Sequence, residues 1–160
     1  MFSGLRDHPF AVEAFFKTSL VLTFAFPKEQ LQPLMPQCLE LDTYDNKWAF
    51  LAVAVVDTKG LRPKSFPAFM GNDFVLVGYR LFVKYYTNNN KRLRGLYILR
   101  SETNRRLMET LGNMFTHYEY VRTDIRLLPT EDNIIIKSTS GLFIEANNSK
   151  TDIALPTGSP

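Results

Sequence analysis

The sequence predicts a mostly β protein of the α+β class, in which a strongly bent antiparallel sheet or barrel carries one amphipathic helix near residues 104–116. Two observations support this fold class. Most apolar residues fall in short runs or alternate with polar residues, as they do in strands, and one segment alone has clear helical spacing. The 160 residues contain no internal repeat and no linker composition, so we expect a single domain spanning 1–160.

The first part of the chain predicts three strands and a short helical turn. The apolar run at 19–26 is typical of a buried strand, and the proline-bounded segment 27–36 indicates the helical turn. Residues 39–45 and 47–58 have the pattern of two strands, and the Asp-Asn pair at 45–46 favours a tight turn between them.

A long loop and a hairpin come next. Residues 59–73 contain prolines and have no clear period, which predicts an irregular loop of the kind that often carries function. Residues 74–86 and 92–100 are expected to form a hairpin. Its polar tip at 87–91 is rich in asparagine, which tolerates left-handed backbone geometry.

The helix near 104–116 is predicted by apolar residues that recur on one helical face. Three further strands are expected after it, at about 118–128, 133–139 and 142–146. The apolar stripe of the helix consists of Leu107, Met108, Leu111, Met114 and Phe115.

Composition and charge restrict the cellular location and the classes of partner that we expect for this protein. The single cysteine, Cys38, excludes an internal disulfide, is expected to be buried, and fits a reducing, cytoplasmic location. The apolar run at 19–26 is too short to span a bilayer and no signal-peptide cleavage site follows it, so we expect no membrane partner. The net charge of +3 is spread along the chain, which argues against a nucleic-acid partner. The basic and aromatic hairpin tip at 84–94 fits base stacking, and a solvated tip explains it equally well.

Motifs for metals and phosphates are missing from the sequence. His8 and His117 lie far apart, and no Cys/His cluster accompanies either of them. Neither a glycine-rich phosphate loop nor a G-x-S-x-G elbow is present. The sequence therefore predicts neither a metal site nor a cofactor.

Six short segments follow one another in a recognisable order. They are LQPLMP at 31–36, LELDTYD at 39–45, GLRPKSFPAF at 60–69, YRLFV at 79–83, GLYILRSETN at 95–104 and LGNMFTHYEYVRTDI at 111–125. This series resembles the uncharacterised bacterial YqjF-like family, whose members are similar in fold to acetoacetate decarboxylase. The resemblance covers roughly residues 19–128 and depends on the order of the segments, since no single one is diagnostic. Because members of the family are typically longer, we expect this chain to be truncated at its C-terminus.

The resemblance also implies where the chemistry of acetoacetate decarboxylase would lie. In that enzyme a lysine pair follows the corresponding helix, and one lysine forms a Schiff base with the ketone substrate. Positions 116–120 read Thr-His-Tyr-Glu-Tyr here, so neither lysine is present, and the carboxylate of Glu119 cannot form an imine. A glutamate that relatives tend to carry earlier in the chain corresponds to Leu76. The sequence argues against Schiff-base decarboxylation and leaves open whether the protein is an enzyme.

Glu119 is a candidate site residue because of its position in the strand expected at 118–128. The odd-numbered positions of this strand form its apolar side, and Glu119 stands at the end of that side. A carboxylate facing an apolar interior must be paired, hydrogen-bonded or protonated.

Two arginines of the predicted hairpin form a second candidate group. The expected register places Arg80 opposite Ile98 and Arg100 opposite Gly78, which puts both guanidinium groups on one apolar face. Two guanidinium groups among large apolar side chains are well suited to binding an organic carboxylate.

Two interpretations of these residues remain open. In the functional interpretation, a central cavity binds a small organic carboxylate. Its candidate catalytic residues are Glu119, His117 and Tyr118, and its candidate ligand-binding residues are Arg80, Arg100, Arg62 and Tyr120. In the structural interpretation, Glu119 or Glu102 neutralises the two hairpin arginines, and Arg62 and His117 are solvated surface groups. The corresponding alternative function is a non-catalytic structural or interaction protein that forms a homo-oligomer.

Overall fold

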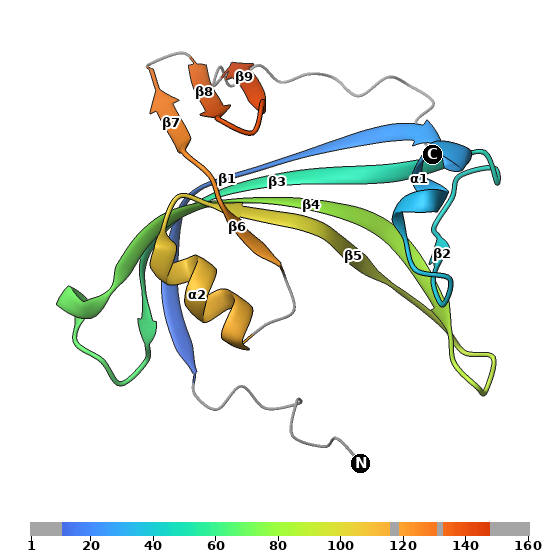
Figure 1. Ribbon diagram of the computed structural model, residues 1–160, viewed down its shortest axis with the longest axis horizontal. Coiled ribbons are helices and arrows are strands. Elements are labelled where there is room, and N and C mark those ends of the chain that lie inside the picture. Colours follow the sequence, from blue (N-terminus) through green and yellow to red (C-terminus); the bar gives the residue numbers. More distant parts are fainter. Residues whose placement is uncertain (1–10, 116–118, 131–132, 148–160) are drawn as a thin grey trace, which may run out of the picture. The chain divides into compact units, whose positions relative to one another are not determined.

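The computed structural model describes residues 11–115, 119–130 and 133–147 (Figure 1). Its residues group into two compact units, one ending at Arg122 and the other beginning at Thr123. Each unit is considered by itself. No helix in the described part of the chain is long and apolar enough to cross a membrane.

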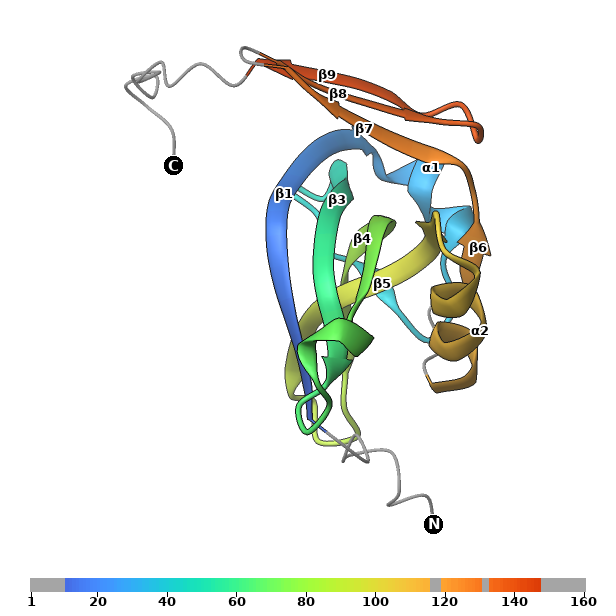
Figure 2. The same ribbon diagram turned by 90° about the vertical axis from the view of Figure 1, so that its left-hand side faces the viewer.

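The first unit is built on a six-stranded sheet, which confirms the mostly β prediction. The strands hydrogen-bond in the order β1-β3-β4-β5-β6, with β2 attached to β4. All pairs are antiparallel except β5 and β6, which are parallel. Figures 1 and 2 show how strongly the long strands bend, and among the described residues the sheet ends at β1 and β6 without closing into a barrel. The strands are β1 (Val12–Pro27), β2 (Glu40–Leu41), β3 (Trp48–Pro63), β4 (Asn72–Tyr86), β5 (Arg92–Thr103) and β6 (Tyr120–Arg122).

The strand expected at 19–26 is present as part of β1, but the prediction that it is buried was wrong. β1 is an edge strand that pairs with β3 alone among the described strands. Val21 is 59% exposed and Phe24 is 46% exposed. An apolar run indicates a strand, yet it does not say which of the strand's faces other parts of the chain will cover. Cys38, expected to be buried, is also exposed.

The turn at 45–46 is confirmed, since Asp45 and Asn46 both have left-handed backbone angles, with φ of 50° and 51°. The helical turn at 27–36 is also confirmed, as the short helix α1 (Lys28–Leu31) followed by the 3₁₀ turn η1 (Gln32–Leu34). The strand expected at 39–45 is reduced to β2. This short strand pairs with β4 at Val83 and Lys84, just past Leu81, which pairs with Leu51 near the beginning of β3.

The loop expected at 59–73 is shorter than predicted because β3 continues to Pro63 and β4 begins at Asn72. A bulge between Thr58 and Leu61 interrupts the pairing without ending the strand. A Cβ at Gly71 would lie 2.7 Å from the Cα of Gly60. The backbones of β3 and of the segment before β4 therefore approach so closely at these two glycines that a side chain at Gly71 would clash. The 3₁₀ turn η2 (Ala68–Met70) occupies the loop between them.

The hairpin of β4 and β5 is confirmed, but its register changes part of the way along. Arg80 pairs with Ile98, as predicted. The next pair joins Tyr79 to Arg100, so Leu99 is an extra residue in β5 and forms a bulge. Arg100 therefore lies opposite Tyr79, and the prediction that it faces Gly78 was wrong.

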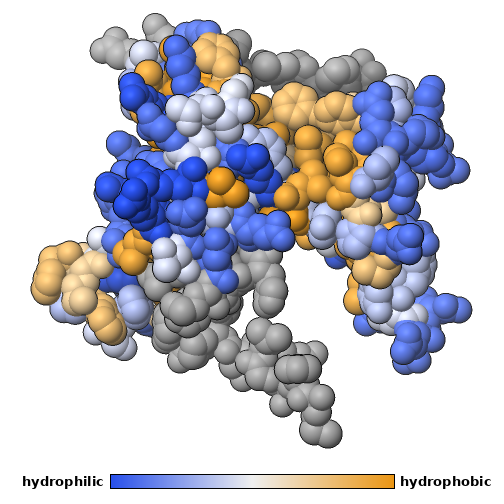
Figure 3. Space-filling view, in the orientation of Figure 1, coloured by the Kyte–Doolittle hydropathy of each residue, from blue (hydrophilic) through white to orange (hydrophobic). Residues whose placement is uncertain are grey.

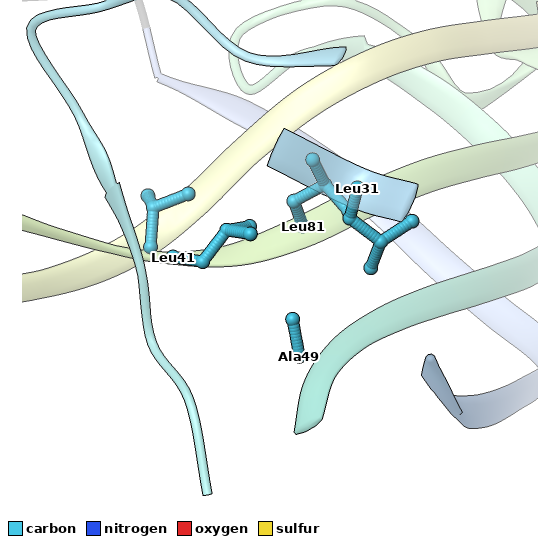
Figure 4. Packing of buried hydrophobic residues seen from close by; sticks show 5 residues of the cluster. Leu31, Leu41, Ala49 and Leu81 are labelled. Carbon is cyan, nitrogen blue, oxygen red and sulfur yellow. The ribbon is translucent and has the colours of Figure 1, made fainter. Parts of the chain in front are cut away.

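A small core lies where α1 and β2 pack on the long strands. Leu31 of α1 and Leu41 of β2 are each 5% exposed and join Ala49, Leu81 and Val83 in one buried cluster (Figure 4). The exposed polar side of the helical turn carries Gln32, whereas Leu31 faces inward. Burial of these aliphatic groups fixes the turn at 28–34 against one face of the sheet.

The helix α2 (Arg106–Phe115) corresponds to the helix predicted near 104–116. It connects β5 to the parallel strand β6, and Figure 2 shows it alongside that strand. The side chain of Asn113 closes the edge of β6: its Nδ2 donates to the carbonyl oxygen of Tyr120 at 2.9 Å, and its Oδ1 accepts from the Tyr120 amide at 2.7 Å. These two bonds fix where β6 begins.

The second unit contains a three-stranded antiparallel sheet in the order β7-β8-β9. The strands are β7 (Ile125–Pro129), β8 (Asn133–Ser138) and β9 (Phe143–Asn147). Ile125, Ile136 and Ile144 are buried. The last two strands match the predicted positions, whereas the strand expected at 118–128 divides into β6 and β7, which belong to different sheets.

Candidate functional site

The sheet of the first unit presents two faces, and the register assigns each candidate residue to one of them. The "Arg80 face" bears Ala52, Ala54, Gly78, Arg80, Phe82, Ile98, Ser101 and Tyr120. The "Arg100 face" bears Val53, Val55, Val77, Tyr79, Leu81, Arg100 and Glu102. The bulge at Leu99 separates the two arginines, so they do not form the pair that the sequence predicted.

Arg80 is partly buried, and its side chain folds back along its own strand over Gly78. A Cβ at Gly78 would lie 3.2 Å from Nε of Arg80 and 3.4 Å from Nη2, so the glycine leaves the space that the guanidinium uses. The Nε atom is buried and has no hydrogen-bond partner among the described residues. No described carboxylate forms an ion pair with Arg80.

The surroundings of Arg80 combine apolar and hydroxyl groups. Phe82 stands two residues further along the same face and packs edge-to-face on Phe50 of β3, with ring centroids 6.2 Å apart. On the other side of the guanidinium, Gly78 pairs with Ser101, and Ser101 pairs with Tyr120. The positive group therefore lies between an aromatic pair and a row of hydroxyl-bearing residues.

Arg100 has a structural partner. Its Nε lies 2.9 Å from Oε1 of Glu102, two residues along the same strand. The Glu102 side chain is 1% exposed and the Arg100 side chain is 48% exposed. This contact is the one that the structural interpretation expects for Arg100, since a cation beside a buried carboxylate offsets part of the cost of burying its charge.

Arg62 is engaged as well, and it lies in β3 instead of the loop in which the sequence placed it. Its Nη2 lies 2.7 Å from Oε2 of Glu13 on the neighbouring strand β1. Its Nη1 donates to the carbonyl oxygen of Gly60 and its Nε to that of Phe66, each at 3.2 Å. Arg62 thus connects β1 to the loop after β3.

Glu119 does not face the interior, so this part of the prediction was wrong. It is exposed, has a left-handed backbone with φ of 47°, and immediately precedes β6. Tyr120 is 8% exposed and occupies the inward position instead. His117 and Tyr118 lie outside the described residues.

Sequence reasoning missed a group of basic residues around a cleft. The cleft has a volume of about 670 Å³ and lies where β4 begins, where β5 continues into α2 and where β6 ends. Arg105, Arg106 and Arg122 line it. Their positions in the sequence gave no signal, because only the β5-α2-β6 connection brings residue 122 close to residues 105 and 106.

The fold defines the class of protein to which this chain is similar. The crystal structure of acetoacetate decarboxylase from Legionella pneumophila superimposes with a TM-score of 0.58 at 14% sequence identity. The match covers 84% of this chain and 46% of that one, so the chain spans about half the length of the enzyme it resembles. At this level of identity the likeness establishes the fold.

The chain belongs to the DUF2071 family, described as an uncharacterized conserved protein (COG2071), whose model matches residues 14–159. This finding and the structural match confirm the family and fold that the ordered sequence segments indicated. Among curated protein sequences, none matches this chain.

Proposed function

We propose that this protein binds a small organic carboxylate at Arg80. The observation that supports the proposal is the buried Nε of Arg80, which has no hydrogen-bond partner among the described residues. A buried guanidinium donor without an acceptor is unfavourable, and a ligand that supplies the acceptor removes this cost. A carboxylate is the matching group, since its two oxygens can accept from the parallel N–H bonds at Nε and Nη2.

The neighbours of Arg80 favour a small ligand with an apolar part. Phe82 and Phe50 offer aromatic contacts on one side, and Ile98 lies directly across the strand pair. Ser101, on the other side, is 4% exposed and can contribute a hydroxyl group. A short alkyl or keto carboxylate satisfies both sides, with its charged end at Arg80 and its chain against the rings.

The proposal concerns binding and assigns no reaction. Schiff-base decarboxylation needs a lysine amine, and the matching positions 116–120 contain none. Glu119 cannot form an imine and is exposed. We therefore infer a binding role that differs in chemistry from acetoacetate decarboxylase while using a similar fold.

Calorimetry with butyrate and butyramide tests the proposal. Butyramide has nearly the same shape but lacks the negative charge, so we expect it to bind at least about tenfold more weakly than butyrate. Equal affinities would show that the site does not recognise a carboxylate. No heat from butyrate, acetoacetate or hexanoate at millimolar concentration would contradict the proposed function.

A second candidate function is favoured by β1, whose outer edge has no strand partner among the described residues. Register shifts before Thr18 interrupt its first part, but from Thr18 to Pro27 it is regular and contains no charged residue. Long uncharged edges are places where another strand can add to a sheet. We propose that a second copy of this chain pairs there, which would make the protein a homo-oligomer with a structural role.

Replacing Val21 with lysine is expected to convert such a dimer into monomers. Val21 is 59% exposed near the middle of the edge strand, and a lysine there would carry its charge into the interface. Size-exclusion chromatography with light scattering measures the change. Leu93→Lys is the control, because Leu93 is 44% exposed on another strand. A wild-type protein that is monomeric at all concentrations would reject the candidate.

A further inference from the structure

The cleft beside α2 lies entirely within the first unit and is distinct from the surroundings of Arg80. One wall is formed by Gly71, Asn72 and Asp73 at the start of β4, and the other by residues 104–108 and Arg122. In the space-filling view the deepest blue gathers where α2 begins (Figure 3).

Three guanidinium groups from two separated segments line the cleft. Arg105 donates from Nε to the carbonyl oxygen of Asp73 at 3.1 Å, which holds it against the opposite wall. Arg106 and Arg122 form no ion pair with a carboxylate among the described residues. The carboxylate of Glu109 lies nearby, since its Oε1 accepts a hydrogen bond from the backbone amide of Arg122 at 3.4 Å, but no ion pair joins it to either guanidinium group among the described residues.

Asp73 is the acidic residue lining the cleft, and its carboxylate is already engaged. Its Oδ1 accepts a hydrogen bond from the amide of Gly60 at 2.9 Å, and its Oδ2 lies 3.4 Å from Nζ of Lys59. The Gly60 amide, followed by Lys59 and Arg105, lowers the pKa of Asp73 below its ordinary value. These contacts are on the β3 side of the carboxylate, and no ion pair joins Asp73 to Arg106 or Arg122 among the described residues.

We propose that this cleft binds a small phosphate-bearing molecule through Arg105, Arg106 and Arg122. A monocarboxylate carries one charge and two acceptors, which one guanidinium satisfies, whereas three guanidinium groups match the charge and the several oxygens of a phosphate group. The Oδ1 of Asn104 accepts from the Val75 amide at 2.9 Å, so this oxygen is already engaged away from the guanidinium donors that the anion would use. The volume of about 670 Å³ accommodates a phosphate and the small organic group that carries it.

The test uses inorganic pyrophosphate and calorimetry on the full chain. Replacing Arg106 and Arg122 together with glutamine is expected to weaken pyrophosphate binding by at least about tenfold. Both residues are exposed, so the double variant should fold as the wild type does. Arg92→Gln with Arg94→Gln is the matched control, since it removes the same charge from exposed positions of the hairpin.

Two results would overturn the inference. Equal weakening in the variant and the control would show a response to net charge and no defined site. A single-stranded RNA that binds at this cleft while pyrophosphate does not would show a nucleic-acid surface instead. Butyrate binding separates this inference from the proposed function: Arg106→Gln/Arg122→Gln should leave it unchanged, and Arg80→Met should leave pyrophosphate binding unchanged.

Discussion

Replacing Arg80 with methionine is expected to weaken butyrate binding by at least about tenfold, because the variant loses the charge-assisted hydrogen bonds to the carboxylate. The same change is expected to alter the free energy of unfolding by less than about 1 kcal/mol. Methionine can follow much of the path of the arginine stem over Gly78. It also removes a buried Nε that lacks a partner among the described residues, which offsets the lost packing.

Calorimetry and urea unfolding measure the two effects separately. Arg94→Met is the control, since Arg94 has a 64% exposed side chain and pairs with Asp42 at a distance of 3.0 Å. This control should leave butyrate binding unchanged. If Arg80→Met binds butyrate normally, Arg80 is not the anchor. A loss of about 3–5 kcal/mol in stability would instead mark Arg80 as half of a buried ion pair.

Replacing Arg100 with methionine is expected to lower stability by about 2 kcal/mol and to have little effect on butyrate binding. Glu102 is 1% exposed, so removing the cation 2.9 Å away takes an ion-pair partner from a buried carboxylate. The buried charge of Glu102 is then less well stabilised than in the wild type. Urea unfolding at pH 7 measures the loss.

A double variant tests the cause of that loss. Arg100→Met combined with Glu102→Leu removes both charges and should recover most of the stability, because apolar replacement of a whole buried pair is often neutral. Recovery would show that the buried charge of Glu102 was responsible. An Arg100→Met variant that loses less than about 1 kcal/mol would contradict the assigned role of the pair.

The sequence predicted the architecture well because strands, turns and helices depend on local patterns. The turn at Asp45 and Asn46, the hairpin tip and the helix after β5 all arise from such patterns. Burial was harder to predict, since it depends on which elements cover a strand. Val21 and Phe24 therefore belong to a correctly predicted strand and are nevertheless exposed.

The candidate site was predicted only in part because a single extra residue changed its geometry. The register places Arg80 opposite Ile98 as expected, but the bulge at Leu99 moves Arg100 to the other face. The alternation of side chains along a strand does not reveal such a bulge, since no glycine or proline marks it. The space for the Arg80 guanidinium over Gly78 likewise becomes visible only with coordinates.

In the segment at 119–127, too, the alternation of apolar residues did not predict which side chains are buried. Its alternation holds from Thr123 to Leu127 in the second unit, but Tyr120 and not Val121 is buried in the first. The left-handed backbone at Glu119 and the two hydrogen bonds from Asn113 set the orientation of β6 independently of the residues after it. One continuous apolar pattern thus covered two short strands of different sheets.

The central claim is that the guanidinium group of Arg80 binds the carboxylate. The NMR signal of the Arg80 Nε–Hε group is the most direct measure of this binding. In a ¹H–¹⁵N spectrum, with the Arg80 Nε–Hε signal assigned by its loss in Arg80→Met, butyrate should shift that signal in a saturable way and butyramide should not. A titration that leaves this signal in place while others, such as that of Arg100, move would place the carboxylate elsewhere and contradict the account.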